Sequence, residues 1–210
     1  MSGGCRPRPW KDIMAGNKKS LQNYRQKRNA DKTAEPMPEE SSLTGTGKRP
    51  IFVIQQHDAS TLHFDFRIQD QGVLKSWAVP KGPSTDPKQK RLAIPTEDHP
   101  LAYADFEGII PEGEYGAGTV LVWDRGEYEN IKNNKKEEVK SISEQIRDGQ
   151  VTIRLKGEKI SGGYALIRTG DNRWLLIKMD DEELMPGAIR SPQSRSRSNP
   201  GSPWMRYEKK

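Results

Sequence analysis

The chain has 210 residues, of which 32% are hydrophobic and 30% are charged, with a mean hydropathy of −0.93 and a formal net charge of +6. A single cysteine, Cys5, excludes an internal disulfide and a cysteine-rich zinc site, and no apolar run reaches the roughly 18–20 residues of a membrane span. The N-terminal segment lacks the apolar core of a signal peptide, so we expect a cytoplasmic protein with no membrane partner.

The charge is distributed unevenly along the chain. Residues 1–50 and residues 131–210 each carry a net charge of +6, whereas residues 51–130 carry −6 and contain all three histidines. This pattern fits a centre that holds a cation between flanks that attract phosphates. A solvated acidic surface with basic tails is the simpler explanation of the charge alone.

Composition divides the chain into three regions. Residues 1–48 form a polar N-terminal arm, mobile or wrapped around the rest, with a short helix expected at Ser20–Arg28. Residues 49–182 contain almost all the strand signals and form the predicted domain. Residues 183–210 include the run SPQSRSRSNPGSP and form a basic tail that we expect to be disordered.

The central region alternates short β-rich segments with turn residues. The sequences QDQG (residues 69–72) and TGDN (residues 169–172) are typical of hairpin turns, and one helix is expected at Ser141–Asp148. Many short strands joined by tight turns predict a mainly β protein, an antiparallel sandwich or barrel rather than a doubly wound sheet. The predicted strands are Ile51–Gln56, Leu62–Ile68, Val73–Val79, Arg91–Pro95, Gly118–Trp123, Gln150–Leu155, Gly163–Arg168 and Trp174–Lys178.

The segment Leu62–Ile68 shows strict alternation of apolar and polar residues. Because successive side chains of a strand point to opposite faces, His63, Asp65 and Arg67 share one face and the apolar residues share the other. Same-face neighbours lie about 6.6 Å apart along a strand, so an imidazole, a carboxylate and a guanidinium can converge on one small ligand. A half-exposed strand with its polar face in water is the ordinary alternative.

A second segment, TEDHPLAY at residues 96–103, holds His99 in a loop that follows a predicted strand. Such a loop can point a ring nitrogen toward a site, although a polar turn is the commoner meaning of a single histidine. Two histidines and one aspartate are sufficient ligands for a divalent ion with open positions, and they suit Mn²⁺, Fe²⁺ or Zn²⁺ better than Ca²⁺. Arg67 beside such an ion would neutralise a phosphate, because its planar fork matches phosphate geometry.

Two other segments are less specific. The loop VPKGPSTDPKQKR (residues 79–91) is basic and either contacts phosphates or is simply solvated. The segment PEGEYGAG (residues 111–118) holds three glycines but lacks the ending and the βαβ setting of a nucleotide-binding loop, so we expect a structural turn.

Several blocks of the sequence closely resemble the phosphoesterase module of the bacterial multifunctional DNA ligase D, which acts in nonhomologous end joining. They are QQHDASTLHFDFRI, GVLKSWAVPKGPSTDPKQKRLA, EDHPLAYADFEGIIPEGEYGAGTVLVWDRGEYE and RWLLIKMDD, and they cover roughly residues 20–182. The resemblance implies a compact antiparallel β-barrel with a Mn²⁺ site, in which Co²⁺ or Zn²⁺ could substitute. Because the ligase and polymerase modules are missing, the chain looks like a stand-alone member.

The activity implied by the resemblance is the trimming of 3′ ends of DNA or RNA–DNA primers. Family members remove a terminal ribonucleoside to leave a 3′-phosphate and then hydrolyse that phosphate to a 3′-hydroxyl. His57, Asp65 and His99 match the metal ligands, which we expect to meet inside the barrel. His63 and Arg67 match the groups that hold the scissile phosphate.

The resemblance also implies supporting residues. Tyr103 matches a nearby hydroxyl partner, and Lys81 and Arg91 match basic residues linked to the phosphomonoesterase step. Glu35 matches an acidic residue needed for activity. Where the arm of the family commonly has another acidic residue, this sequence has Asn29.

Alternative functions remain open at this point. A non-catalytic module that binds nucleic-acid ends with a vestigial metal site fits the same basic flanks. A metal-dependent phosphatase of small molecules fits the same ligands but would gain nothing from the basic arm. A separate DNA ligase or polymerase is an expected protein partner.

Overall fold

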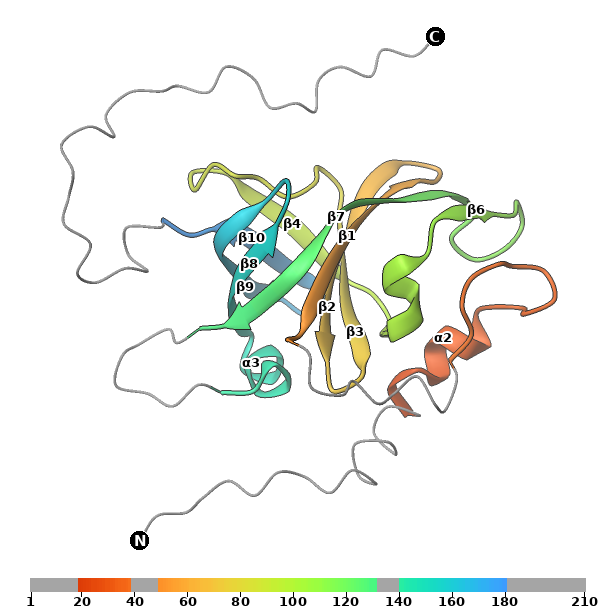
Figure 1. The fold of residues 1–210 in the computed structure, drawn as a ribbon, viewed down its shortest axis with the longest axis horizontal. Helices are drawn as coiled ribbons and strands as arrows, with labels where there is room; N and C mark the ends of the chain where they lie inside the picture. Colours follow the sequence, from red (N-terminus) through yellow and green to blue (C-terminus); the bar gives the residue numbers. More distant parts are fainter. Residues whose placement is uncertain (1–18, 39–48, 132–139, 181–210) are drawn as a thin grey trace, which may run out of the picture.

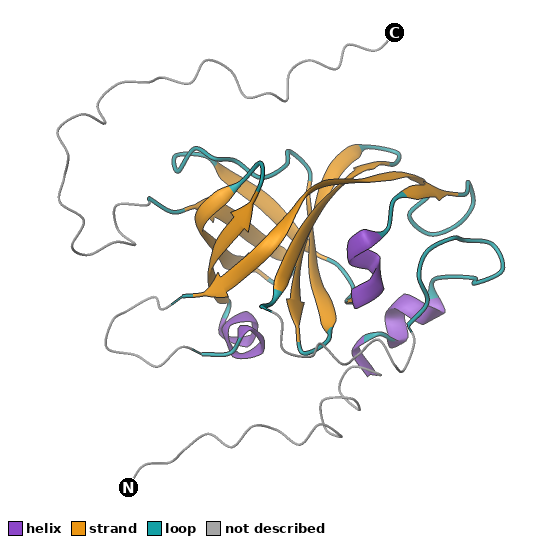
Figure 2. Cartoon of the chain, viewed as in Figure 1, coloured by secondary structure: helices purple, strands orange, loops and turns teal. Residues whose placement is uncertain are grey.

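The computed structural model describes residues 19–38, 49–131 and 140–180. The predicted boundary at residue 48, the tail at residues 183–210 and Cys5 therefore lie outside the described residues. Ten strands and three short helical segments make up this part (Figure 2). The strands are β1 (Ile51–Asp58), β2 (Leu62–Asp70), β3 (Val73–Val79), β4 (Lys90–Pro95), β5 (His99–Pro100), β6 (Gly108–Ile110), β7 (Gly118–Asn130), β8 (Gln150–Gly157), β9 (Ser161–Gly170) and β10 (Arg173–Lys178), and the helices are α2 (Gln22–Gln26), the 3₁₀ turn η2 (Leu101–Asp105) and α3 (Ile142–Asp148).

Eight of the strands close into an antiparallel barrel. Their order is β1-β2-β3-β4-β10-β9-β8-β7, and β7 pairs back onto β1 (Figure 1). β6 continues the sheet beyond β7, and β5 pairs with β3. The predicted mainly β fold, an antiparallel barrel with a few short helices, is confirmed.

The barrel interior is filled by apolar side chains from all eight closed strands. The predicted alternation along β2 is also confirmed, since Phe64, Phe66 and Ile68 point into this interior. The opposite face of β2 therefore lies on the outer wall of the barrel. Our expectation of a site inside the barrel is wrong, because the apolar side of the same strands occupies that space. The main interior residues are Phe52, Phe66, Trp77, Ala93, Tyr128, Ile153, Tyr164 and Trp174.

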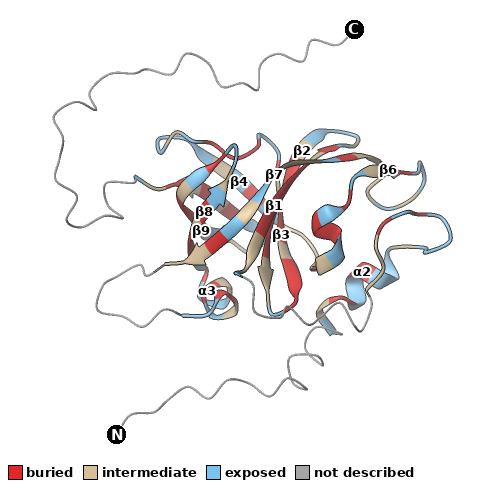
Figure 3. Cartoon of the chain, viewed as in Figure 1, coloured by how far each residue is buried: buried red, intermediate tan, exposed pale blue. Residues whose placement is uncertain are grey.

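The outer wall along β1 and β2 is covered rather than exposed to water. Figure 1 shows α2 and the segment after it on the outer side of the barrel, next to η2. Leu21 and Tyr24 of the arm pack with Tyr103 of η2, Val53 of β1 and Val120 of β7 in a second apolar cluster. Both faces of this part of the sheet are consequently buried (Figure 3). The alternative of a half-exposed strand, with its polar face in water, does not apply to this part of β2.

The turns and the helix between strands follow their sequence signals. The β2–β3 turn has left-handed backbone at Gln71 and Gly72, with φ of 50° and 84°, as the QDQG sequence predicts. α3 begins with a capping box between Ser141 and Glu144 and ends at Gly149, whose φ is 86°. The strand β7 is longer than predicted, because its charged half from Asp124 onward pairs with β1 and, from Gly126, also with β8.

Candidate active site

His57 and His63 lie directly opposite each other in the antiparallel pairing of β1 and β2, with ring centroids 4.7 Å apart. Asp65 shares their face of the sheet. Its Oδ2 atom is 3.6 Å from His57 Nδ1, and its Oδ1 atom is 3.8 Å from His63 Nε2. One ligand atom of each residue lies within 4.8 Å of the other two, a spacing at which all three could bind a single metal ion.

Each imidazole of this cluster is oriented by a backbone carbonyl. His57 Nε2 is 2.9 Å from the carbonyl oxygen of Gly116, and His63 Nδ1 is 2.9 Å from that of Thr61. Since a carbonyl only accepts, these nitrogens donate, and the other nitrogen of each ring points toward Asp65. Two ring nitrogens and a carboxylate that face one another form a donor set that fits a divalent transition metal.

Asp65 is buried next to Arg67, which donates from Nη2 to Asp65 Oδ2 at 3.0 Å. Burial alone would raise the pKa of Asp65, but Arg67 and the two imidazoles outweigh it and hold this pKa below its ordinary value. The carboxyl group is therefore ionised at neutral pH, which is the form that binds a metal.

The other two nitrogen groups of Arg67 are also fixed. Nε donates to Gln55 Oε1 at 2.8 Å, and Nη1 lies 3.0 Å from His99 Nδ1. Gln55 is fully buried and donates its amide to the backbone carbonyls of Tyr103 and Phe106 at 3.0 and 2.9 Å. Gln55 thus connects the position of Arg67 to the backbone of the η2 segment.

His99 lies outside the metal-ligand cluster, on the far side of Arg67. Its Nδ1 atom is 2.8 Å from the backbone oxygen of Glu97, and its Nε2 atom is 3.4 Å from Arg28 Nη2. Burial, together with Arg67 and Arg28, lowers the pKa of His99 well below its ordinary value, so the ring is neutral at pH 7. In the described residues, His63 rather than His99 completes the group that could hold a metal.

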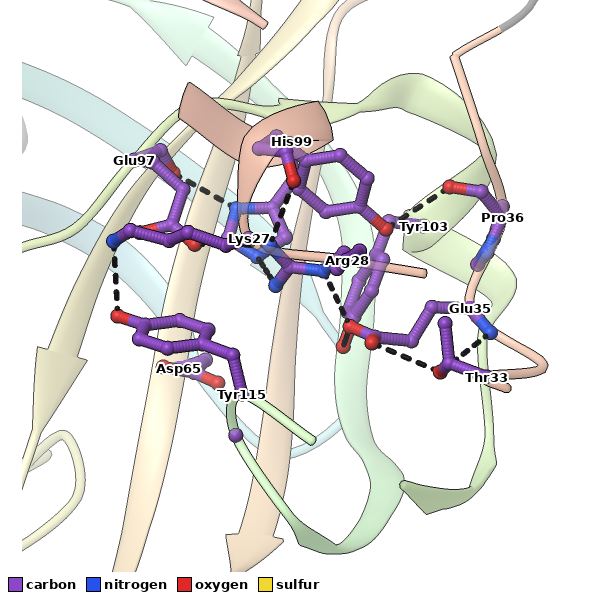
Figure 4. A network of polar contacts seen from close by, with 12 residues as sticks. Lys27, Arg28, Thr33, Glu35, Pro36, Asp65, Glu97, His99, Tyr103 and Tyr115 are labelled. Carbon is purple, nitrogen blue, oxygen red and sulfur yellow. Dashed lines mark hydrogen bonds and ion pairs between the residues drawn. The ribbon is translucent and has the colours of Figure 1, made fainter. Parts of the chain in front are cut away.

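Arg28, in the N-terminal arm just after α2, supplies a second buried guanidinium (Figure 4). Its Nε atom donates to Glu35 Oε1 at 2.8 Å, its Nη1 atom donates to Glu97 Oε1 at 3.0 Å, and its plane stacks on the ring of Tyr24 at 3.7 Å. The hydroxyl of Tyr103 also donates to Glu35 Oε1, at 3.0 Å. The buried Glu35 therefore serves to hold Arg28 against the barrel.

Lys27 joins the arm to the loop between β6 and β7. Its ammonium group is 3.0 Å from Glu97 Oε2 and 3.1 Å from the hydroxyl of Tyr115. Tyr115 directly precedes Gly116, whose carbonyl orients His57. The arm and the metal-ligand cluster are thus linked through one loop.

The remaining predicted site residues lie at the edges of this network or outside it. Lys81 is exposed in the loop between β3 and β4, and Arg91 donates to Gln89 at the start of β4. Asn29 and Asp31 are exposed, and the Asn29 side chain accepts from the backbone N–H of Asp31. Both residues thus lie at the surface, whereas Glu35 is the buried carboxylate within the described part of the arm.

The charges around the site balance without a metal. The cationic side chains are Lys27, Arg28 and Arg67, and the carboxylates are Glu35, Asp65 and Glu97. A divalent cation would give the site a charge of about +2, which complements a phosphate dianion.

The sequence profile described as the DNA Ligase D 3′-phosphoesterase domain matches residues 55–168. The chain belongs to this family. It is 46% identical over 169 residues to the multifunctional non-homologous end joining protein LigD of Pseudomonas aeruginosa, and 47% identical over 163 residues to that of Mycobacterium bovis. These matches cover 79% and 78% of this chain but only 19% and 20% of the two LigD proteins.

Family membership confirms the resemblance seen in the sequence and implies a hydrolase that acts on phosphoesters. The matched residues contain the three metal-ligand candidates, Arg67 and His99, whereas Arg28 and Glu35 lie before them. In the described part of the chain, no helix is long and apolar enough to cross a membrane.

Proposed function

We propose that this chain is a metal-dependent phosphoesterase that converts 3′-phosphate ends of DNA to 3′-hydroxyl ends. The observation that carries the proposal is the grouping of two imidazole nitrogens and one carboxylate within reach of a single ion, beside two buried guanidinium groups. The match to a 3′-phosphoesterase domain supports the choice of substrate.

His57, His63 and Asp65 would hold the metal ion, for which the mixed imidazole and carboxylate set favours Mn²⁺, with Co²⁺ or Zn²⁺ as substitutes. When bound there, a divalent ion supplies Lewis-acid polarisation of a phosphoryl oxygen. We infer this ligand set from the geometry, in place of the set with His99 that the sequence resemblance implied.

Arg28 and Arg67 would bind the phosphate and stabilise its negative charge in the transition state. Arg28 Nη2 has only a long contact of 3.4 Å to His99 Nε2, so it remains available to a phosphate oxygen. The neutral His99 ring separates the two guanidinium groups without adding a third positive charge. Lys81 and Arg91, which are basic and more exposed, would contact the substrate in the phosphomonoesterase step.

We further propose removal of a terminal 3′-ribonucleoside from RNA–DNA primer ends, followed by hydrolysis of the resulting 3′-phosphate. The printed names of the LigD relatives concern non-homologous end joining, which supports a substrate of this kind and a role before ligation. A separate DNA ligase or polymerase would then use the 3′-hydroxyl.

The test is turnover of a labelled primer–template with either a 3′-phosphate or a single 3′-ribonucleotide, with chelator and with added Mn²⁺. We expect conversion to a 3′-hydroxyl only with the metal. Tight binding without turnover under all metals would favour a non-catalytic end-binding module. Equal turnover of a free nucleotide 3′-phosphate and of the duplex end would favour a small-molecule phosphatase.

A further inference from the structure

Tyr115 is the only aromatic side chain among the described residues that is largely open to solvent, with 49% of its surface exposed. The aromatic residues of the barrel and of the outer cluster are buried or half-buried. Every nucleobase has a flat face that can stack on an aromatic ring. An exposed ring beside a site for a nucleic-acid end is therefore a candidate for binding a base.

The loop that carries Tyr115 is held in a defined shape. Glu114 donates its backbone N–H to the carbonyl of Pro111, Ala117 donates to that of Glu114, and Gly116 has a left-handed φ of 80°. The Gly116 carbonyl accepts the proton of His57 Nε2. The ring is therefore one residue away from the backbone group that orients a metal ligand.

The Tyr115 ring also lies near Arg28, the arginine of the arm for which we propose phosphate binding. Arg28 Cζ lies 5.6 Å from the ring centroid, and Lys27 donates to the Tyr115 hydroxyl at 3.1 Å (Figure 4). Lys27 Nζ also lies 4.3 Å from the ring centroid, and with both cations nearby about half of the Tyr115 surface remains exposed. In a 3′-phosphate end the nucleobase is one sugar away from the phosphate, so a phosphate held by the metal-ligand cluster and Arg28 would bring the terminal base near the exposed part of this ring.

We propose that Tyr115 is a stacking platform for the nucleobase of the 3′-terminal nucleotide. This inference rests on the proposed function, because it assumes that the phosphate binds between the cluster and Arg28. Stacking of this kind tolerates all four bases, which suits an activity that must act on ends of any sequence.

The experiment compares Tyr115→Phe with Tyr115→Leu on a Mn²⁺-loaded protein. Both variants lose the hydroxyl that binds Lys27, so their difference reports the ring alone. The substrates are two duplexes with a 3′-phosphate, one with a normal terminal nucleotide and one with an abasic terminal sugar. We expect the KM of the Leu variant to exceed that of the Phe variant by about tenfold on the normal end, and the two values to agree on the abasic end.

Equal KM values for the two variants on the normal end would overturn the inference, as would the same tenfold difference on both ends. Leu121→Ala, at a half-exposed apolar residue of β7, is the matched control and should leave the KM unchanged. The parent protein gives a test that needs no variant, since its KM should rise about tenfold when the terminal base is removed. A parent protein that cannot hydrolyse the normal end contradicts the proposed function instead.

Discussion

Arg28 and Glu35 form an ion pair in which both side chains are almost completely buried, with Nε 2.8 Å from Oε1. The two residues belong to a polar arm, yet together they cover the outer wall of the barrel next to the metal-ligand cluster. The arm is thus part of the candidate active site, and its packing sets the direction of one of the two guanidinium groups that would bind phosphate.

Loss of Glu35 should therefore affect both stability and activity. In Glu35→Ala, the buried Arg28 keeps only Glu97 as an anionic partner, and we expect a loss of about 3 kcal/mol in the free energy of unfolding. Phosphatase turnover should fall more than tenfold, with partial recovery in Glu35→Gln, which keeps an oxygen for Tyr103. Urea unfolding and steady-state kinetics measure the two effects.

The control is Asp105→Asn, which breaks an exposed pair with Arg125 and should change stability and turnover little. Equal effects of the two substitutions would contradict the role given to Glu35.

Gln55 offers a test of the bracing of Arg67. Gln55→Leu removes the buried hydrogen bonds that Gln55 makes with Arg67 Nε and with the carbonyls of Tyr103 and Phe106, although the Tyr103 carbonyl keeps the backbone N–H of Phe106. We therefore expect a loss of about 1–3 kcal/mol in the free energy of unfolding. Turnover should fall as well, because Arg67 loses one of the contacts that orient it. The matched control is Gln56→Leu, on the opposite face of the same strand. If the Gln55 variant had the same stability and turnover as this control, Gln55 would not brace Arg67.

His99 should make the stability of the metal-free protein depend on pH. Its pKa is lowered in the folded state, whereas the unfolded chain has the ordinary value near 6.5. Between the two pKa values the unfolded state binds a proton at His99 and the folded state does not. The contribution of His99 to the free energy of unfolding is therefore complete above pH 6.5, and it decreases as the pH falls toward the folded pKa, by up to about 1.4 kcal/mol per pH unit. Urea unfolding of the parent and of His99→Gln from pH 7.5 to 5 should show a flatter curve for the variant, and parallel curves would mean that His99 does not contribute.

The sequence predicts the site where its signals are local. The alternation in Leu62–Ile68 is sufficient to put His63, Asp65 and Arg67 on one face, since that follows from strand geometry alone. It does not reveal which face lines the barrel, because that depends on where the strands close and on what covers the outside. Pairing of His57 with His63 is likewise a matter of register between two strands.

Residues that depend on tertiary packing were missed. Arg28 is one of several basic residues of the arm, so its sequence context does not mark it out. Its burial comes with contacts to Glu35, after a turn of the arm, and to Glu97, which is distant in the chain. Gln55 has a weak signal, because it lies two residues before His57 and therefore on the same face of β1. The expectation that His99 is a metal ligand rests on the resemblance alone, whereas in the structure Arg67 contacts both His99 and Asp65 and so stands between His99 and the cluster.

The most direct test of the account is a Mn²⁺ titration of the purified protein and of two variants, His63→Gln and His99→Gln, followed by calorimetry or by electron paramagnetic resonance. We expect one site in the parent protein, loss of at least tenfold in affinity in His63→Gln, and nearly unchanged affinity in His99→Gln. Retained affinity in His63→Gln together with lost affinity in His99→Gln would contradict the proposed metal centre.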